Sequence, residues 1–199
     1  MTPKRDEELL AAHLAGISEA FGTLVARYTD EIYGFVLRFV GNAAAAEDLT
    51  QETFLQVHLA AGAFDPQRSF RPWLYTIAAN KARDYLRGRG RRAELPLEAR
   101  AADDEGPLGG QYLEAENVAP DEVADAEQAR QTVRELIATM PEHLRLILVL
   151  GYYHQLPYAE MAEILDIPVG TVKSRLHSAV MHFAKLWRSR SRASTSEER

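Results

Sequence analysis

Apolar residues return at three- and four-residue intervals along much of the chain, which is the spacing of one face of an α-helix. Over residues 6–40 this pattern is interrupted near Gly16 to Glu19, which predicts two helices rather than one. Asn42 is a suitable N-cap for a third helix over residues 43–61, because its side chain can accept a hydrogen bond from a free amide of the first turn. We therefore expect an all-α fold.

The third predicted helix has one apolar and one polar face. The inward face is expected to hold Leu49, Thr53, Phe54 and Val57. The outward face then carries Asp48, Gln51, Glu52 and Gln56. A polar helix face is often merely solvated, so this pattern alone leaves open whether the face binds a partner.

The next stretch combines aromatic and basic residues. Phe64 to Phe70 is predicted to be a loop with a turn at Asp65 and Pro66. A helix from Pro72 follows, and residues 81–92 hold six basic side chains and one acid. Exposed aromatic rings beside a basic run are typical of proteins that hold single-stranded nucleic acid, but aromatic residues at helical spacing also pack in cores. The residues at core spacing are Trp73, Leu74, Ile77, Ala78 and Tyr85.

Charge divides the chain into parts. The net charge is −6, yet residues 93–127 hold 11 acidic and 1 basic side chains, against 11 and 12 in residues 1–92 and 7 and 10 in residues 128–199. Like-charge repulsion, proline and glycine predict a flexible acidic linker over 93–127, which tethers two domains without fixing their orientation.

Helical periodicity resumes at about Asp121 and runs to Met140. Pro141 then starts a compact apolar helix that is expected to form the centre of a second core. Residues 156–187 have the pattern of a helix-turn-helix, in which Asp166, Ile167 and Pro168 form the break. Residues 188–199 are expected to be a disordered tail.

The second helix of this motif has two dissimilar faces. Its expected core face is Val172, Leu176, Val180 and Phe183. No acidic residue occurs from Ile167 to Ser196, so the other face is basic and suits a DNA major groove. A helical hairpin with a solvated basic face is the alternative that this stretch alone permits.

Several classes of protein are excluded or disfavoured. The absence of cysteine excludes disulfides, thiol catalysis and cysteine-ligated zinc. His177 and His182 lie five apart, unlike the four-residue spacing of paired metal ligands on a helix, and no glycine-rich phosphate loop or nucleophile–base set is present. We therefore expect no enzyme, no metal and no cofactor. The N-terminus has acids where a signal peptide needs an apolar run, and no segment is long and apolar enough to span a membrane, so a cytoplasmic protein is expected.

Two motif blocks, in this order around an acidic linker, resemble the extracytoplasmic-function (group 4) sigma factors of bacterial RNA polymerase, in the sigma-70 family. The block AEDLTQETFLQVH with FRPWLYTIAANKARDYLRGRGRR resembles sigma region two. The block MPEHLRLILVLGYYHQLPYAEMAEILDIPVGTVKSRLHSAV resembles region four. The resemblance implies a promoter-specificity subunit with a region two domain over 1–92, the linker over 93–127 and a region four domain over 128–187.

The resemblance also implies roles for individual residues. It assigns docking on core polymerase to Asp48, Gln51 and Glu52. It assigns to the loop from Phe64 to Phe70 the binding of a base turned out of the stack. Recognition and opening of the minus-ten strand falls to Trp73, Tyr75, Asn80, Lys81, Asp84 and Arg87. Binding of the minus-thirty-five duplex falls to Thr171, Lys173, Ser174, Arg175, His177 and Ser178, with Thr171 and Arg175 on phosphate.

The implied partners are core RNA polymerase, promoter DNA and an anti-sigma protein, with a monomer when free and no membrane insertion. The chain departs from the family pattern at Pro157, Asp166 and Ser178. A free-standing helix-turn-helix repressor or activator is the main alternative, but it would not need the aromatic and basic character of residues 64–92.

Overall fold

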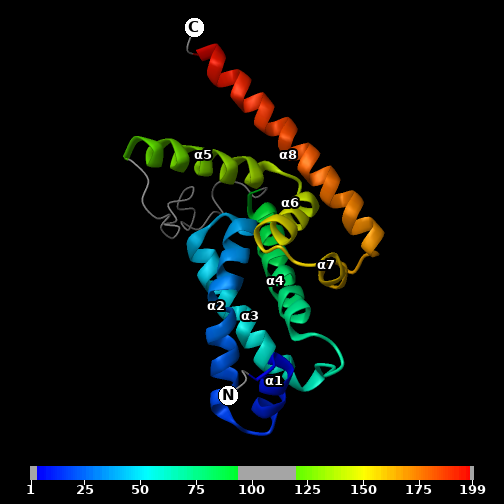
Figure 1. Ribbon diagram of the computed structural model, residues 1–199. Helices are drawn as coiled ribbons and strands as arrows, with labels where there is room; N and C mark the ends of the chain where they lie inside the picture. The colour runs from blue at the N-terminus through cyan, green and yellow to red at the C-terminus, as the bar shows by residue number, and fades with distance from the viewer. Residues whose placement is uncertain (1–3, 94–119, 198–199) are drawn as a thin grey trace.

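The first half of the chain is a bundle of long helices in the computed structural model, which describes residues 4–93 and 120–197 (Figure 1). Its helices are α1 (Asp6–Leu14), α2 (Ser18–Val40), α3 (Ala43–Ala60) and α4 (Phe70–Ala93), with a 3-10 turn η1 (Ala61–Ala63) after α3. Helix α2 packs against α1, α3 and α4, so it is the centre of the bundle.

Local chemistry sets the helix boundaries that the sequence predicts. Gly16 between α1 and α2 and Gly41 after α2 have φ of 90° and 78°, a left-handed conformation that glycine adopts without a steric penalty. The Asn42 side chain accepts a hydrogen bond of 2.8 Å from the amide of Ala45, which confirms the predicted N-cap.

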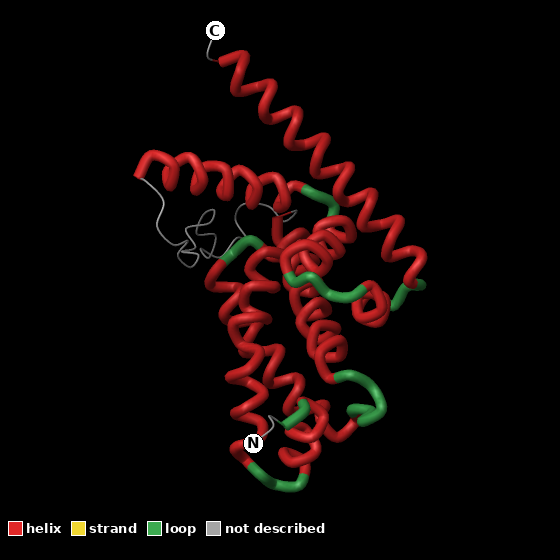
Figure 2. Tube along the Cα trace, viewed as in Figure 1, coloured by secondary structure: helices red, strands yellow, loops and turns green. Residues whose placement is uncertain are grey.

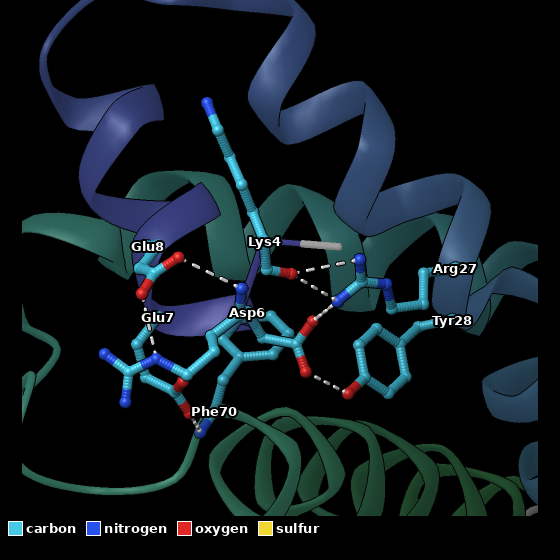
Figure 3. A network of polar contacts seen from close by, with 8 residues as sticks. Lys4, Asp6, Glu7, Glu8, Arg27, Tyr28 and Phe70 are labelled. Atoms are coloured by element: carbon cyan, nitrogen blue, oxygen red, sulfur yellow. Dashed lines mark hydrogen bonds and ion pairs between the residues drawn. The ribbon is translucent and has the colours of Figure 1, made fainter. Parts of the chain in front are cut away.

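A network of polar contacts holds α1 against α2 and α4 (Figure 3). Asp6 pairs with Arg27 and accepts a hydrogen bond of 2.5 Å from the Tyr28 hydroxyl. Glu7 accepts a hydrogen bond of 3.0 Å from the amide of Phe70, the first residue of α4. Because free amides lie at a helix N-terminus, this carboxylate fixes where α4 begins.

The second half consists of α5 (Pro120–Thr139), α6 (Glu142–Leu148), a π-helical turn η3 (Val149–Tyr153), α7 (Tyr158–Leu165) and α8 (Val169–Glu197). Helix α4 ends and helix α5 begins inside the range assigned to the linker, and residues 94–119 lie outside the described residues. Figure 2 shows that the described residues form helices and loops without strands, and all-α is confirmed as the fold class.

Helices α7 and α8 form the predicted helix-turn-helix. Asp166 ends α7 with φ 51° and ψ 50°, so the tight corner places a non-glycine residue in the left-handed region. Val172 on α8 and Met161 on α7 are fully buried, and α8 packs against both α6 and α7, as the second core predicted from the sequence requires.

The two halves pack against each other through α4 and α7, which lie side by side (Figure 1). The buried residues of both halves form one continuous apolar cluster. A linker alone would leave the orientation of the halves free, so their arrangement here is set by the side chains that meet between them.

Two details of α8 differ from the sequence prediction. Val180 is 47% exposed, while Ala179 is fully buried in its place. At 100° per residue Ala179 lies about 20° from Val172 around the helix and Val180 about 80°, so the alanine is nearer the centre of the buried face. The expected disordered tail was also wrong for residues 188–197, because α8 continues to Glu197. Nothing in that segment breaks a helix, and Arg190 pairs with Glu135 of α5 at 3.1 Å.

Candidate nucleic-acid interface

The first turns of α8 carry the polar face predicted to meet duplex DNA. The exposed residues of this face are Lys173, Ser174, Arg175, His177 and Ser178, and Thr171 is half-buried. On the opposite side of α8, Val172 and Ala179 are buried. The helix therefore stands on the domain with its predicted recognition residues directed away from the core.

Side-chain contacts organise this face. Lys173 Nζ lies 5.9 Å from the centre of the Tyr158 ring, which is at the start of α7. The hydroxyls of Ser174 and Ser178 donate to the carbonyls of Thr171 (3.1 Å) and Ser174 (3.0 Å). The serine oxygens keep lone pairs for a partner, and the lysine charge is held over an aromatic ring at the edge of the face.

The outward face of α3 is the predicted docking face. Asp48, Gln51 and Glu52 are exposed there, and the residues expected to pack inward are buried: Leu49, Thr53, Phe54 and Val57. Glu52 pairs with Lys81 of α4 at 3.1 Å. The predicted docking face and the predicted strand-binding helix are therefore joined by an ion pair.

Helix α4 presents only part of the predicted strand-binding set to solvent. Asn80, Asp84 and Arg87 are exposed, and Lys81 is partly exposed beside Glu52. Arg87 pairs with Asp84 one turn away. These residues lie on one side of the C-terminal half of α4, where an extended strand can reach them.

Trp73 lies beside the loop predicted to receive a base. Its ring is half-buried, with its centre 4.9 Å from the centre of the Phe64 ring and 5.9 Å from that of Phe70. Residues 65–69 are exposed, and the predicted turn is present, since Asp65 accepts a hydrogen bond of 2.9 Å from the amide of Gln67. The loop thus has an aromatic base and a polar, open tip.

Tyr75 is fully buried, so the alternative of a core position holds for this ring, and it cannot stack on a base in this arrangement. Its hydroxyl donates to Glu31 Oε1 at 2.8 Å and lies 2.9 Å from Nδ1 of His154, a residue of the second half of the chain. The spacing along α4 could not separate Tyr75 from Trp73, because the covering side chain comes from 79 residues further along the sequence.

The cluster around Tyr75 was not predicted from the sequence. Arg71 pairs with Glu31, and its pKa is raised because this hydrogen bond and charge attraction outweigh the opposing effect of burial. Burial, and then the positive charge of Arg38, lowers the pKa of His154 to about 4. His154 is therefore neutral, and a proton on Nδ1 would allow it to donate to the Tyr75 oxygen. No single stretch of sequence contains the cluster, because Glu31 and Arg38 lie on α2, Arg71 and Tyr75 on α4, and His154 directly after η3.

The part of the chain that the structure describes contains no group of three or more His, Asp or Glu side chains able to hold a metal ion. Within the same residues, none of the helices has the length and apolarity needed to cross a membrane.

Comparison with known families matches both halves of the chain. The family described as Sigma-70 region 2 covers residues 24–92, and that described as Sigma-70, region 4 covers residues 130–183. The ECF RNA polymerase sigma factor SigW of Bacillus subtilis is 36% identical over 162 residues, which are 81% of this chain and 86% of that protein. The RNA polymerase sigma-H factor of Pseudomonas aeruginosa is 34% identical over 179 residues, 90% of this chain and 92% of that protein.

Two solved structures match the fold over most of the chain. CnrH in complex with the cytosolic domain of CnrY matches with a TM-score of 0.67 and 25% identity over 94% of this chain and 99% of that chain. The sigma factor RpoE of Bartonella quintana, in complex with the anti-sigma factor NepR, has the same fold, with a TM-score of 0.64 and 20% identity over 84% of this chain and 96% of that one.

The chain therefore belongs to the extracytoplasmic-function sigma factors of the sigma-70 family. It is a transcription initiation factor without enzymatic activity, which binds core RNA polymerase and directs initiation at specific promoters by recognising and melting their DNA.

Proposed function

We propose that the chain is a group 4 factor in which three separate surfaces divide the work of initiation. The observation that carries this proposal is the separation of charge: an acidic face on α3 and a basic face on α8 are both exposed, on different halves of the chain. Residues 1–92 then form the docking and strand-binding domain, and residues 128–187 the duplex-binding domain, preceded by the first turns of α5.

The α3 face, Asp48, Gln51 and Glu52, docks on the polymerase. Its two carboxylates and one amide suit a basic partner surface, and the buried Leu49 and Phe54 anchor the opposite side of the helix in the core. The pairing of Glu52 with Lys81 leaves Asp48 as the carboxylate of this set with no ion pair in the described residues.

The minus-ten strand is held by α4 and the loop before it. Asn80, Lys81, Asp84 and Arg87 supply polar and charged contacts, and Trp73 with Phe64 supplies an aromatic floor for an unstacked base. Opening of the duplex needs no nucleotide hydrolysis if bases are captured as they leave the stack. Tyr75 contributes indirectly, because its hydroxyl bonds Glu31, which pairs with Arg71 at the start of α4.

The minus-thirty-five duplex is bound by α8. Lys173, Ser174, His177 and Ser178 reach base edges, while Thr171 and Arg175 contact phosphates. Serine at position 178 reaches less far than a long basic side chain, so base preference at that point is weak.

The free protein is a cytoplasmic monomer that is held inactive by an anti-sigma protein. Support for the anti-sigma partner comes from CnrH and RpoE, whose structures are complexes with CnrY and the anti-sigma factor NepR. The cytoplasmic location follows from that of the polymerase on which the chain acts.

In vitro transcription tests the proposal. Purified chain and bacterial core polymerase are mixed with a randomised promoter library, and the RNA starts are sequenced. Starts that require the chain and lie downstream of two recurring elements are expected. Palindromic duplex binding by the chain alone, with no chain-dependent starts, would instead identify a free-standing regulator.

A further inference from the structure

Helix α1 contacts the chain on both sides of the loop from Phe64 to Phe70 (the base loop). It packs against η1, which leads into the loop, and against α4, which follows it. Glu7 Oε1 accepts a hydrogen bond of 3.0 Å from the amide of Phe70 (Figure 3). Towards the other end of α1, Nε2 of His13 lies 3.0 Å from Nδ1 of His58, near the end of α3. Side chains of one short helix therefore reach the segments that enter and leave the base loop.

Phe70 connects α1 to the aromatic side chains of the loop. Its ring is fully buried, and the ring centre lies 5.7 Å from that of Tyr28 on α2. The same centre lies 6.2 Å from that of Phe64 and 5.9 Å from that of Trp73. Phe64 and Trp73 form the proposed aromatic floor for an unstacked base. Because packed side chains transmit displacements to their neighbours, a shift of Phe70 would move this floor.

Contacts with α2 fix the first turn of α1, from which Glu7 projects. Asp6 pairs with Arg27 and accepts a hydrogen bond of 2.5 Å from the Tyr28 hydroxyl (Figure 3). Leu10, in the next turn, is buried. A helix as short as α1 is marginal by itself, so these contacts keep it in place. The Glu7 carboxylate is thus held on a fixed support.

The shape of the base loop depends on where its ends are held. Residues 65–69 are exposed, and the amides of Gln67 and Arg68 bond to Asp65 at 2.9 and 3.0 Å, which forms a local turn. Such a turn sets the tip of the loop but not the distance between its ends. A loop that is already shaped for a base has less conformational entropy to lose when the base binds.

We propose that α1 positions the base loop, with Glu7 as the positioning residue that holds the Phe70 end of the loop where the minus-ten base requires it. This role rests on the proposed binding of a flipped base by the loop. The match to Sigma-70 region 2 begins at residue 24 and does not include α1. Glu7 acts through Phe70, so it affects strand capture and base selection, but neither docking through α3 nor duplex binding through α8.

Two substitutions separate the hydrogen bond from the charge. Glu7→Gln loses the carboxylate charge but keeps an oxygen that can accept from the Phe70 amide. Glu7→Met loses the same charge and has similar length and helix propensity, but its thioether is only a weak acceptor. Glu8→Met is the control on the same helix, because Glu8 is exposed and its carboxylate bonds Arg5 of the same segment at 2.9 Å.

The position of the loop is measured in the free protein by tryptophan fluorescence. The chain has two tryptophans, so Trp187→Phe leaves Trp73, beside the base loop, as the single reporter. In this background Glu7→Met is expected to increase the quenching of Trp73 by acrylamide, because a displaced Phe70 uncovers its ring. Glu7→Gln and Glu8→Met are expected to match the parent. Equal quenching in all of these proteins overturns the positioning role.

Base selection is measured by transcription of the randomised promoter library with core polymerase. Glu7→Met is expected to use the preferred minus-ten sequences about fivefold less than Glu7→Gln, the effect of losing one hydrogen bond. It is also expected to weaken base preference at one position of that element and to leave preferences in the minus-thirty-five element unchanged. A general loss of stability would lower the use of all promoters together. Unchanged base preference in Glu7→Met, or equal losses in Glu7→Met and Glu7→Gln, overturns the proposal.

The wild type separates this inference from the proposed function. If chain-dependent starts appear and the variants do not differ, the proposed function stands and the positioning role of Glu7 is removed. If no chain-dependent starts appear, the proposed function is removed, and the Trp73 comparison in the free protein still decides whether Glu7 holds the loop.

Discussion

Lys81 Nζ lies 3.1 Å from Oε2 of Glu52, so a residue proposed to hold the promoter strand is paired with one proposed to dock on the polymerase. The pair joins α4 to α3 at the surface, where both side chains remain partly exposed. An exposed pair of this kind contributes up to about 1 kcal/mol to stability. If both proposed roles hold, contact of Glu52 with the polymerase would release Lys81 for DNA.

The docking face is tested with Asp48→Ala and Glu52→Ala together. The double variant is expected to lose co-elution with core polymerase in gel filtration, because two carboxylates of the face are removed. Lys81→Ala is the control, since it breaks the ion pair but leaves the face intact, and it is expected to co-elute normally. Normal co-elution of the double variant would contradict the proposed docking face.

The duplex-binding face is tested with Lys173→Ala and His177→Ala. Each base-edge contact is worth about 1–3 kcal/mol, so we expect at least a several-fold loss of holoenzyme affinity for the upstream element. Core binding should be unchanged, as measured by co-elution. Lys185→Ala, about three turns further along α8, is the matched control and is expected to have a smaller effect. A fall in core binding would show that the face has been assigned wrongly.

The corner between α7 and α8 stores backbone strain at Asp166, which has φ 51°. Asp166→Gly removes the clash of a side chain in the left-handed region, so the free energy of unfolding is expected to rise by about 0.5–1 kcal/mol. Asp166→Asn keeps the shape without the charge and should change stability little, whereas Asp166→Val should lower it. Denaturant unfolding measures the stability of all three variants. A valine variant that is more stable than the wild type would contradict backbone strain at this position.

Gly151 and Gly22 form a matched pair of glycine positions. A Cβ at Gly151 would lie 3.2 Å from side-chain atoms of Leu176 and Met161, whereas nothing lies within 4 Å of one at Gly22. Gly22→Ala within α2 is expected to stabilise the protein by about 0.5–1 kcal/mol through helix propensity. Gly151→Ala is expected to destabilise it by about 1 kcal/mol, because two packed side chains must shift. Thermal unfolding of the two variants should therefore move in opposite directions.

Stability should depend on pH through His154. Its pKa is about 4 in the folded protein against 6.5 for the unperturbed group, mainly because of burial and also because of the nearby positive charge of Arg38 and Arg71, with Glu31 acting in the opposite direction. The unfolded chain takes up the proton as pH falls through 6.5, but the folded chain does so only near 4, so stability is lost between these values. At pH 5, protonation of His154 in the unfolded chain lowers the free energy of unfolding by about 2 kcal/mol.

His154→Asn has no titrating group at this position, so its loss of stability between pH 7 and pH 5 should be smaller than that of the wild type by about this amount. Unfolding in denaturant at both pH values gives the comparison. Parallel pH profiles for the two proteins would show that His154 is solvated and titrates normally in the folded state.

Neighbouring residues in the sequence determined most of the helices and the class of protein. The cap at Asn42, the break near Gly16, the corner at Asp166 and the apolar spacing on α3 all act within a few residues, so a single stretch of sequence contains the whole interaction. The two motif blocks also lie within continuous stretches, and they were sufficient to indicate a sigma factor with docking, strand-binding and duplex-binding surfaces.

Only the tertiary structure decided which side chains those surfaces leave accessible. Trp73 and Tyr75 are both aromatic and lie two positions apart in the sequence, yet Tyr75 is fully buried because Glu31 and His154 reach it from distant segments. Ala179 replaces Val180 in the core because the direction from which α6 covers α8 is not encoded in α8 alone. The pairing of Arg68 and Arg71 with α7 has the same cause: hydrophobic spacing fixes a helix face locally, but the partner of that face is selected by packing of the whole chain.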